Sequence, residues 1–340
     1  MYRFFRPLLF RLDPETAHGL TLNLVRLAGN FQTSRWLLQA IFAVPQKPVE
    51  AFGLKFKNPV GLAAGYDKDG IAIRGLAALG FGHLEIGTVT PLPQPGNPKP
   101  RIFRLVEEEA VINRMGFPGR GASEVVKKLT AVRRPRVGCI VGINLGKNKQ
   151  TSNDEAVFDY LALLQNFALL ADYLTINVSS PNTVGLRRLQ GREALENLLT
   201  QLAHQRRLEQ KKLEKHIPLL VKLAPDLGDA ELDDALEVIL HTGMDGVIAT
   251  NTTLGREGLK SKHREESGGL SGRPLTVLSE ALLAKTVKRL DGRIPVVSVG
   301  GIMSPEDARL RLDMGAALVQ LYTGLVYAGP GLVKKIVRSL

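Results

Sequence analysis

Short apolar runs and longer segments of helical periodicity alternate along the chain from about residue 60. Each run passes into a loop rich in glycine, asparagine or proline, and a segment with helical spacing follows. Because most positions of a run are apolar, both faces of the strand that it forms are expected to be buried, as in parallel sheets. The eight runs are PVGLAAG, HLEIGTV, RVGCIVGINLG, YLTINVSS, IPLLVKLAP, GVIATNT, IPVVSVGG and LVQLYTG. Eight strand and helix repeats predict an α/β fold, a (β/α)8 TIM barrel, with an open doubly wound sheet as the alternative.

Two kinds of local signal refine this prediction. REALENLLTQLAHQRRLEQKK, after the fourth run, and SPEDARLRLDMG, after the seventh, have helix signals, and Ser304 followed by Pro305 predicts a capped start for the second. VEAFGLKFKNPV, before the first run, alternates with period two around a glycine. We therefore expect a small hairpin that closes the floor of the barrel.

The first 48 residues have a different pattern and are expected to form an N-terminal helical extension, residues 1–48, in front of a barrel domain, residues 49–340. Asp13 followed by Pro14 predicts a helix start, and Ser34 is expected to cap a second helix over RWLLQAIF. An earlier stretch has apolar residues at helical spacing between arginines, and Pro7 is expected to limit how much of it is helical. These apolar residues are Phe5, Leu8, Leu9 and Leu12.

The extension is also unusually basic. It carries six lysines and arginines against two acids, a net +4, so the other 292 residues carry +8. Basic residues beside an apolar stripe favour a helix lying in a lipid interface. Helices packed on the barrel with a solvated rim are the alternative, and the residues alone leave both open.

Composition sets further limits. The chain has 340 residues, 44% of them hydrophobic, and a formal charge of +12, which attracts anionic substrates, lipids or nucleic acids. The single cysteine, Cys139, excludes an internal disulfide framework and fits a reducing compartment, and its apolar surroundings indicate a buried structural thiol. Arg3, Arg6 and Arg11 interrupt the N-terminal apolar runs, so we expect neither a cleaved signal nor a membrane-spanning helix.

Candidate chemistry lies where the strands end, because reacting groups of such barrels come from the carboxyl ends of the strands. These ends offer amides, hydroxyls and ammonium groups and lack the paired carboxylates of a glycosidase. The histidines are scattered, and His83 and His216 stand beside strand starts at the opposite end, so no catalytic metal is expected. The strand-end candidates are Lys68, Thr88, Asn144, Asn177, Ser179, Ser180, Asn182, Thr183, Lys222, Thr250, Asn251 and Thr252.

The last two strands suggest a phosphate site. SVGGI, with Gly300 and Gly301, and LYTG form neighbouring loops of the kind that bind phosphate through backbone N–H groups, and GGLSGRP supplies a flexible basic loop nearby. A phosphate site with two strand-end lysines fits a sugar-phosphate enzyme with a Schiff-base lysine or an enzyme of flavin mononucleotide (FMN). The ring of asparagines favours the flavin, because flat amide-bearing rings need paired donors and acceptors.

Between residues 60 and 327 the sequence resembles the dihydroorotate dehydrogenases of class 2, the quinone-linked type. The matching motifs, in family order, are AAGYDKDG, NRMGFPG, GINLGKNK, INVSSPNTVGLRRLQ, VKLAPDL, ATNTT, GGLSGRPL, SVGGI and LYTGLVY. The first 48 residues resemble the membrane-associating extension of that class.

This resemblance implies an FMN-dependent oxidoreductase of CH–CH groups that converts (S)-dihydroorotate to orotate in de novo pyrimidine biosynthesis. It implies Ser180 as the catalytic base, at a position where class 1 enzymes have cysteine. FMN would be bound by Ala64, Gly65, Lys68, Thr88, Asn144, Asn177, Lys222, Thr250, Gly272, Gly301, Tyr322 and Thr323. The substrate would be held by Lys68, Asn113, Arg114, Met115, Gly116, Phe117, Asn177, Asn182, Asn251 and Thr252.

Several expectations follow from the resemblance. TVGLRRLQG, in which Gly185 and Gly191 flank two arginines, is interpreted as a mobile lid over the substrate, although Arg187 and Arg188 also fit ordinary solvated charges. Ser179 is interpreted as a turn hydroxyl that bonds its own backbone. A quinone is expected as electron acceptor, reached under the N-terminal extension of a peripheral protein at the cytoplasmic face of a bacterial inner membrane. The oligomeric state stays open, with a monomer as one possibility.

Two rival functions remain on the residues alone. A barrel flavoenzyme that reduces uridines in transfer RNA would suit the charge of +12, but it is expected to have an RNA-binding C-terminal domain and a cysteine near the flavin. A non-catalytic anion-binding barrel at a membrane surface is the other rival. We expect no nucleic-acid partner.

Overall fold

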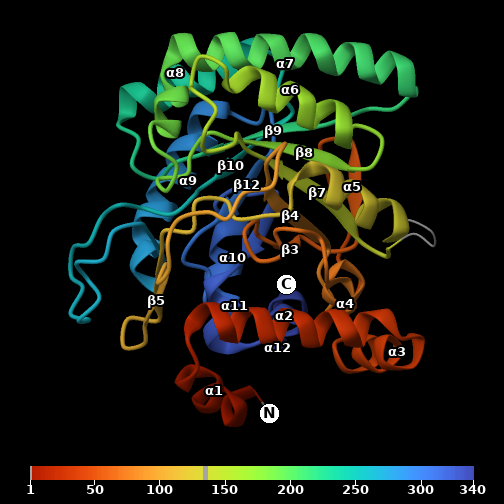
Figure 1. Ribbon diagram of the computed structural model, residues 1–340, viewed down its shortest axis with the longest axis vertical. Coiled ribbons are helices and arrows are strands. Elements are labelled where there is room, and N and C mark those ends of the chain that lie inside the picture. The colour runs from red at the N-terminus through yellow and green to blue at the C-terminus, as the bar shows by residue number, and fades with distance from the viewer. Residues whose placement is uncertain (1, 133–136) are drawn as a thin grey trace.

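Eight parallel strands form a closed barrel at the centre of the computed structural model, which describes residues 2–132 and 137–340 (Figure 1). The last strand pairs with the first and so closes the sheet. The strands are β3 (Val60–Leu62), β4 (His83–Val89), β7 (Ile140–Leu145), β8 (Tyr173–Asn177), β9 (Leu219–Leu223), β10 (Gly246–Ala249), β12 (Val296–Val299) and β13 (Leu318–Leu321). Each lies in one of the eight apolar runs; Arg136, the first residue of the third run, falls outside the described residues. The TIM barrel is confirmed.

Helices follow the strands and cover the outside of the barrel. Ser304 caps α10 as predicted, because its hydroxyl accepts a hydrogen bond from the Asp307 backbone N–H while the Asp307 carboxylate accepts from the Ser304 N–H. The helices are α4 (Ile73–Ala78), α5 (Gly121–Val132), α6 (Ala156–Phe167), α7 (Arg192–Leu213), α8 (Asp229–His241), α9 (Thr276–Leu290), α10 (Pro305–Asp313), α11 (Thr323–Ala328) and α12 (Gly331–Ser339).

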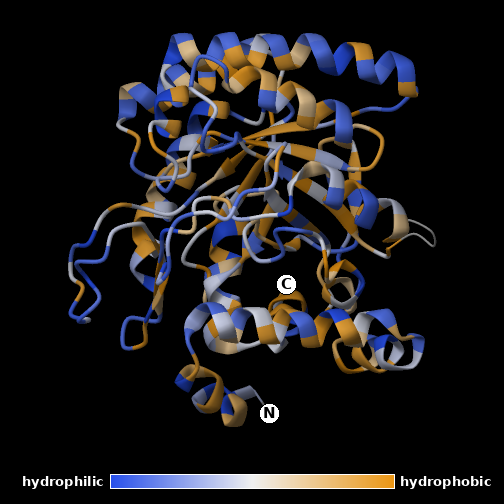
Figure 2. Cartoon of the chain, viewed as in Figure 1, coloured by the Kyte–Doolittle hydropathy of each residue, from blue (hydrophilic) through white to orange (hydrophobic). Residues whose placement is uncertain are grey.

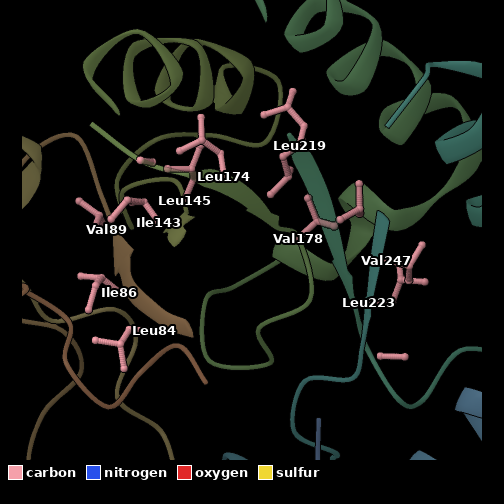
Figure 3. Packing of buried hydrophobic residues seen from close by; sticks show 14 of the residues in the cluster. Leu84, Ile86, Val89, Ile143, Leu145, Leu174, Val178, Leu219, Leu223 and Val247 are labelled. Carbon is pink, nitrogen blue, oxygen red and sulfur yellow. The ribbon is translucent and has the colours of Figure 1, made fainter. Parts of the chain in front are cut away.

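Alternation along each strand separates two sets of side chains. Leu84 and Ile86 of β4, Ile143 of β7 and Leu174 of β8 belong to one buried apolar cluster between the strands and the helices (Figure 3). The intervening residues face the interior of the barrel. That interior is crowded: a Cβ on Gly142 would lie 2.1 Å from the Tyr173 ring. Polar residues at inward positions are therefore held in fixed places.

The predicted hairpin closes the floor of the barrel. Strands β1 (Val49–Ala51) and β2 (Leu54–Phe56) pair antiparallel, and Phe52 and Phe56 pack beneath the inward residues of the barrel strands. His83, the first residue of β4, meets the Phe56 ring edge-on at this floor, and burial lowers its pKa to about 3. His83 thus lies at the end opposite the strand termini. Cys139 comes just before β7 and is only partly buried, whereas the sequence placed it inside the strand.

A second, three-stranded antiparallel sheet arises from the loops after β4 and β10. It consists of β5 (Ile102–Leu105), β6 (Ala110–Asn113) and β11 (Gly269–Gly272). The segment GGLSGRP, expected to be a flexible loop, contributes β11 instead, because its backbone pairs with β6 from Gly269 to Gly272. A short 3-10 helix, Leu186–Gln190, follows β8.

The extension forms α1 (Tyr2–Arg11), α2 (Pro14–Asn30) and α3 (Gln32–Ile41) at one side of the barrel (Figure 1). Asp13 caps α2 as predicted, its side chain accepting from the Thr16 N–H. The prediction for Ser34 is wrong: α3 begins at Gln32, two residues before Ser34, and the Ser34 hydroxyl donates to the Ala28 carbonyl. Helix α1 also continues through Pro7, although proline removes one backbone donor.

The extension combines the two arrangements that its sequence left open. On one side α2 lies against α4, so closely that a Cβ on Gly29 would come 2.3 Å from the Gly75 backbone nitrogen. Elsewhere on these helices apolar residues stay exposed, Phe4 of α1 to 85%. Figure 2 shows that all three helices carry hydrophobic positions. The exposed apolar residues of these helices also include Phe5, Leu8, Leu20, Leu24, Leu27, Phe31, Trp36, Leu37 and Ile41. Over the described residues, none of the helices has the length and apolarity to cross a bilayer.

Candidate active site

One cavity of about 440 Å³ lies where the barrel strands end and continues to the helices of the extension. The strand-end candidates Ser179 and Thr183 do not line it. All residues that the resemblance implies for FMN binding, substrate binding and catalysis line it, except Asn144 and Arg114. Those that line it are Ala64, Gly65, Lys68, Thr88, Asn113, Met115, Gly116, Phe117, Asn177, Ser180, Asn182, Lys222, Thr250, Asn251, Thr252, Gly272, Gly301, Tyr322 and Thr323.

A buried amide network underlies the cavity. The Asn144 side-chain oxygen accepts from the Thr88 hydroxyl at 2.6 Å and from the Asn177 amide at 3.0 Å. The same Asn177 amide donates to the Thr88 hydroxyl at 3.0 Å. Asn144 therefore stands directly behind the wall that Thr88 and Asn177 form, and it fixes how those two groups face the cavity.

The loop after β8 brings two serines to different environments. The Ser180 hydroxyl oxygen lines the cavity and accepts from the Asn182 backbone N–H at 3.2 Å. Ser179 is fully buried and does not line the cavity; its hydroxyl donates to the Asn177 side-chain oxygen at 3.1 Å and accepts from the Asn251 amide at 3.0 Å. The interpretation of Ser179 as a hydroxyl bonded to its own backbone is wrong, because two neighbouring amide side chains offer it better placed partners.

Arg114 is the residue whose position departs most from expectation. Its guanidinium stacks over the Phe103 ring, 4.6 Å from the centroid, and pairs with Glu266 at 2.5 Å outside the cavity. The Arg114 carbonyl accepts from the Asn97 amide, which also donates to the Asn182 carbonyl. Arg114 thus touches the site region through its backbone, and its side chain lies on the outer surface.

Two lysines bring positive charge to the cavity. Lys68 donates to the Gly65 carbonyl at 2.6 Å, and burial together with the positive charge of Arg101 lowers its pKa to about 8. Lys222 lies 4.0 Å from Glu85; burial lowers the Lys222 pKa, and the Glu85 charge opposes that shift. Both ammonium groups face a region that also presents amides and hydroxyls.

The opposite wall is built from turns. Gly300 and Gly301 adopt positive φ of 111° and 71° after β12, and Thr323 begins α11 after β13. The Thr323 hydroxyl donates to the Ser271 hydroxyl at 2.9 Å, which links this wall to β11. The two loops expected to bind a phosphate therefore adjoin each other along one side of the cavity.

The loop between Gly185 and Gly191 is tied across the site. The Arg187 guanidinium donates to the Ser179 carbonyl, to the Thr252 carbonyl and to Asp226 at 2.7 Å. Arg188 is exposed. Arg187 thus joins the loops after β8, β9 and β10, and of the two arginines Arg188 fits the description of a solvated surface charge.

The far arm of the cavity runs between the barrel and α1 and α2. Its wall is mainly apolar, with Leu9, Phe10, Ala17 and Val25 among its residues. His18 adds a polar group here, packed edge-on against Tyr66, and burial together with Lys68 lowers its pKa to about 4. An apolar molecule can therefore lie in contact with the polar end of the same cavity.

Comparison with known proteins places this geometry in a family. The family model described as dihydroorotate dehydrogenase matches residues 47–340. A dihydroorotate dehydrogenase (quinone) from Idiomarina loihiensis is 49% identical over 340 residues, covering 100% of both chains, and one from Halorhodospira halophila is 48% identical, covering 100% of this chain and 97% of its own. The chain belongs to the dihydroorotate dehydrogenase family. Its fold resembles the crystal structure of DHODH from Eimeria tenella in complex with ferulenol, with a TM-score of 0.85, 38% identity, and coverage of 96% of this chain and 90% of that one.

Dihydroorotate dehydrogenases use a flavin, and the cavity suits one. Its wall contains amides, hydroxyls and ammonium groups that match the carbonyl and imide edge of a flavin ring. The Gln320 side-chain oxygen and the Thr252 hydroxyl, both on this wall, are buried without a hydrogen-bond partner. Buried polar groups of this kind are normally satisfied, so they indicate that a polar ligand completes the site.

Two buried polar residues in or beneath this site escaped the sequence analysis. Gln320 lies two residues before Tyr322 on β13, and the same inward alternation identifies it once the register is known. Glu85 lies within the apolar run HLEIGTV, where a lone carboxylate is itself a sign of a buried polar partner. Among the described residues, histidine, cysteine and acidic side chains form no cluster of three suited to a metal ion.

Proposed function

We propose that this protein oxidises (S)-dihydroorotate to orotate in de novo pyrimidine biosynthesis, with a membrane quinone as the final electron acceptor. When bound, FMN would supply the chemistry for taking up a hydride from C6 and passing the electrons on. Family membership and full-length relatives of the quinone-dependent type support the reaction. The observation that carries the proposal is one continuous cavity that joins the amide-rich strand ends to the apolar arm under α1 and α2.

FMN would be held by two walls of the cavity. Gly301, in the turn after β12, Thr323, the first residue of α11, and Gly272, the last residue of β11, would bring backbone N–H groups to its phosphate. The remaining contacts would surround the ring and ribityl chain, with Lys222 near the edge of the ring that becomes negative on reduction. These residues are Ala64, Gly65, Lys68, Thr88, Asn144, Asn177, Thr250 and Tyr322, with Asn144 acting through Thr88 and Asn177.

Dihydroorotate would lie against the amides that surround Ser180. Asn182 is hydrogen-bonded to the Asn113 side chain at 3.2 Å, and Asn251 is hydrogen-bonded to Ser179, so these amides are held in place and would orient the carboxylate and the ring carbonyls of the substrate. Lys68, Met115, Gly116, Phe117, Asn177 and Thr252 complete the binding set. Arg114 would contribute through its backbone carbonyl.

Ser180 is the proposed base that removes the proton from C5. A neutral serine hydroxyl is a weak base, so the developing charge needs stabilisation. The Asn182 backbone N–H already donates to the Ser180 oxygen, and the Lys68 ammonium faces the same cavity. Thr183, three residues farther along the same buried loop, would pass the proton outward through a water molecule.

The extension of residues 1–48 is the proposed membrane and quinone-binding unit. Its exposed apolar residues and net charge of +4 suit the surface of an anionic bilayer. The apolar arm of the cavity lies between this extension and the barrel, where a lipid-borne quinone would enter. We place the protein at the cytoplasmic face of a bacterial inner membrane, bound peripherally.

The proposal is tested with the purified protein under anaerobic conditions. We expect a yellow chromophore that is released as FMN on denaturation and is bleached by dihydroorotate but not by uridine. A quinone then restores the colour, whereas fumarate and NAD⁺ do not. A colourless protein that gains no chromophore from added FMN contradicts the proposal, as does reoxidation by fumarate or NAD⁺ in preference to the quinone.

A further inference from the structure

Glu85 is a carboxylate buried inside the barrel, directly beneath the proposed flavin site. It lies at an inward position of β4, its side chain has no exposed surface, and it is not among the residues that line the cavity. A charge in such a place is costly unless it is compensated. The reaction described above gives Glu85 no part, so its presence needs another explanation.

Donors from three different strands converge on Glu85. One carboxylate oxygen accepts from the Asn144 amide at 2.8 Å, and the other accepts from the Gln320 amide at 2.8 Å and from the Tyr173 hydroxyl at 3.2 Å. Tyr173 keeps its proton, because burial and the nearby Glu85 charge raise its pKa well above the ordinary value. Acceptor oxygens surrounded by donors are the arrangement that suits an ionised carboxylate.

Two of the neighbours of Glu85 reach the cavity. Lys222, whose ammonium lies 4.0 Å from the carboxylate, and Gln320 both line it. A third neighbour, Asn144, fixes Thr88 and Asn177 from behind. Glu85 thus holds the amide orientation of Gln320 and Asn144 and places a negative charge behind the positive charge of Lys222.

We propose that Glu85 is a positioning residue that sets the reduction potential of the bound flavin. Its charge offsets that of Lys222, so that the electron-rich reduced ring is stabilised less than Lys222 alone would stabilise it. The inference rests on the proposed function, because it assumes FMN in the cavity. Its consequence is a flavin that receives electrons from dihydroorotate and still releases them readily to the quinone.

The test is the midpoint potential of the flavin in the holoenzyme, measured by anaerobic spectroelectrochemistry. Glu85→Gln keeps the size and one acceptor oxygen of the side chain but removes the charge. We expect the equilibrium between oxidised and reduced flavin to shift at least tenfold towards the reduced form, a rise of about 30 mV for a two-electron couple. Glu237→Gln, which removes a surface carboxylate on α8, is the matched control and should leave the potential unchanged.

A second pair of variants covers the case in which Glu85→Gln fails to fold because it leaves Lys222 buried and uncompensated. Lys222→Met alone should lower the potential, and the double variant Glu85→Gln, Lys222→Met should return it towards the wild-type value. Equal potentials in wild type and Glu85→Gln, or in Lys222→Met and the double variant, overturn the role of Glu85. A wild-type protein without flavin overturns the proposed function instead, so the two failures are told apart.

Discussion

Ser179 and Ser180 are adjacent in the chain, but their hydroxyls serve different neighbours. Ser180 faces the cavity, whereas Ser179 bridges the side chains of Asn177 and Asn251. We expect Ser180→Ala to lower the rate of flavin reduction by dihydroorotate by a factor of about 10²–10⁴, the usual contribution of a general base. Orotate binding, followed by the shift of the flavin absorbance, should stay within a few-fold of wild type.

Ser179→Ala is the control for that comparison. It removes a hydrogen-bond bridge that contributes about 1 kcal/mol to stability, and it leaves the proposed base in place. Its flavin reduction rate should fall far less than that of Ser180→Ala, in stopped-flow measurements under identical conditions. A larger loss with Ser179→Ala than with Ser180→Ala would show that the assignment of the base is wrong.

Thr183 gives a separate residue-level prediction. It is buried on the loop that carries Ser180 and is proposed to relay the proton. Thr183→Ala should slow flavin reduction while the affinity for orotate stays the same, and Thr183→Ser, which keeps the hydroxyl, should restore most of the rate. An unchanged flavin reduction rate in Thr183→Ala excludes the relay.

Lys68 predicts a dependence of binding on pH. Its pKa of about 8 means that the ammonium is charged below pH 8 and loses its charge above. Because the ammonium faces the cavity where an anionic product would bind, we expect the dissociation constant for orotate to rise as pH increases from 8 to 9.5. In Lys68→Arg, whose guanidinium stays charged over this range, the dissociation constant should be flat. A flat profile in the wild type would contradict the role of Lys68.

At the scale of elements, the loop between Gly185 and Gly191 acts as a strap over the strand ends. Arg187 fastens it to the Ser179 and Thr252 carbonyls and to Asp226. Arg187→Ala should lower the rate of flavin reduction by about tenfold or more, because the Ser180 loop loses a partner that positions it. Arg188→Ala, on the exposed side of the same loop, should keep the wild-type rate. Equal effects of the two substitutions would remove the case for a strap.

The elements also show what the sequence revealed and what it did not. The eight barrel strands were predictable because burial on both faces makes each a nearly uninterrupted apolar run. Strand β11 was not, because GLSG has neither apolar alternation nor β-branched residues and becomes a strand only by pairing with β6. Helix α3 began earlier than predicted, because Ser34 lies within its first turn and its hydroxyl donates to the carbonyls of Ala28 in α2 and of Phe31 instead of capping the helix.

The site residues also fall into two groups, those that the sequence could predict and those that it could not. Residues at strand ends were found because the fold alone places them around one cavity. Glu85 and Gln320 were missed because they lie inside strands, where their role depends on which face they take and on partners from distant strands. The sequence predicts the Arg114 side chain in the substrate site, because the motif indicates only where this residue lies along the chain. In the structure the ion pair with Glu266 holds the guanidinium outside the cavity.

At the scale of the whole molecule, the extension and the barrel share one cavity, so two functions meet in a single chain. Removing residues 1–48 takes away one wall of the apolar arm but leaves the amide network of the barrel intact. We expect the truncated protein to lose quinone reduction and vesicle binding and to keep a flavin that dihydroorotate reduces. Full quinone activity in the truncated protein would contradict the role of the extension.

Truncation also exposes the surface of α4 on which α2 packs, and this exposure can itself destabilise the protein. Substitutions confined to exposed residues of the extension test membrane binding without disturbing that packing. Phe4, Phe5 and Leu8 of α1 are exposed to 85%, 60% and 64%, and their replacement by serine removes apolar surface with little loss of internal packing. This triple variant should keep its thermal stability and its flavin reduction rate but bind anionic vesicles at least tenfold more weakly, because membrane affinity scales with the apolar area that enters the interface.

Replacing Phe158 and Leu169, exposed to 66% and 60% elsewhere on the surface, removes apolar area without touching the extension and should leave vesicle binding unchanged. If both variants weaken binding equally, the protein meets the membrane through general surface hydrophobicity, and the extension has no special part in it.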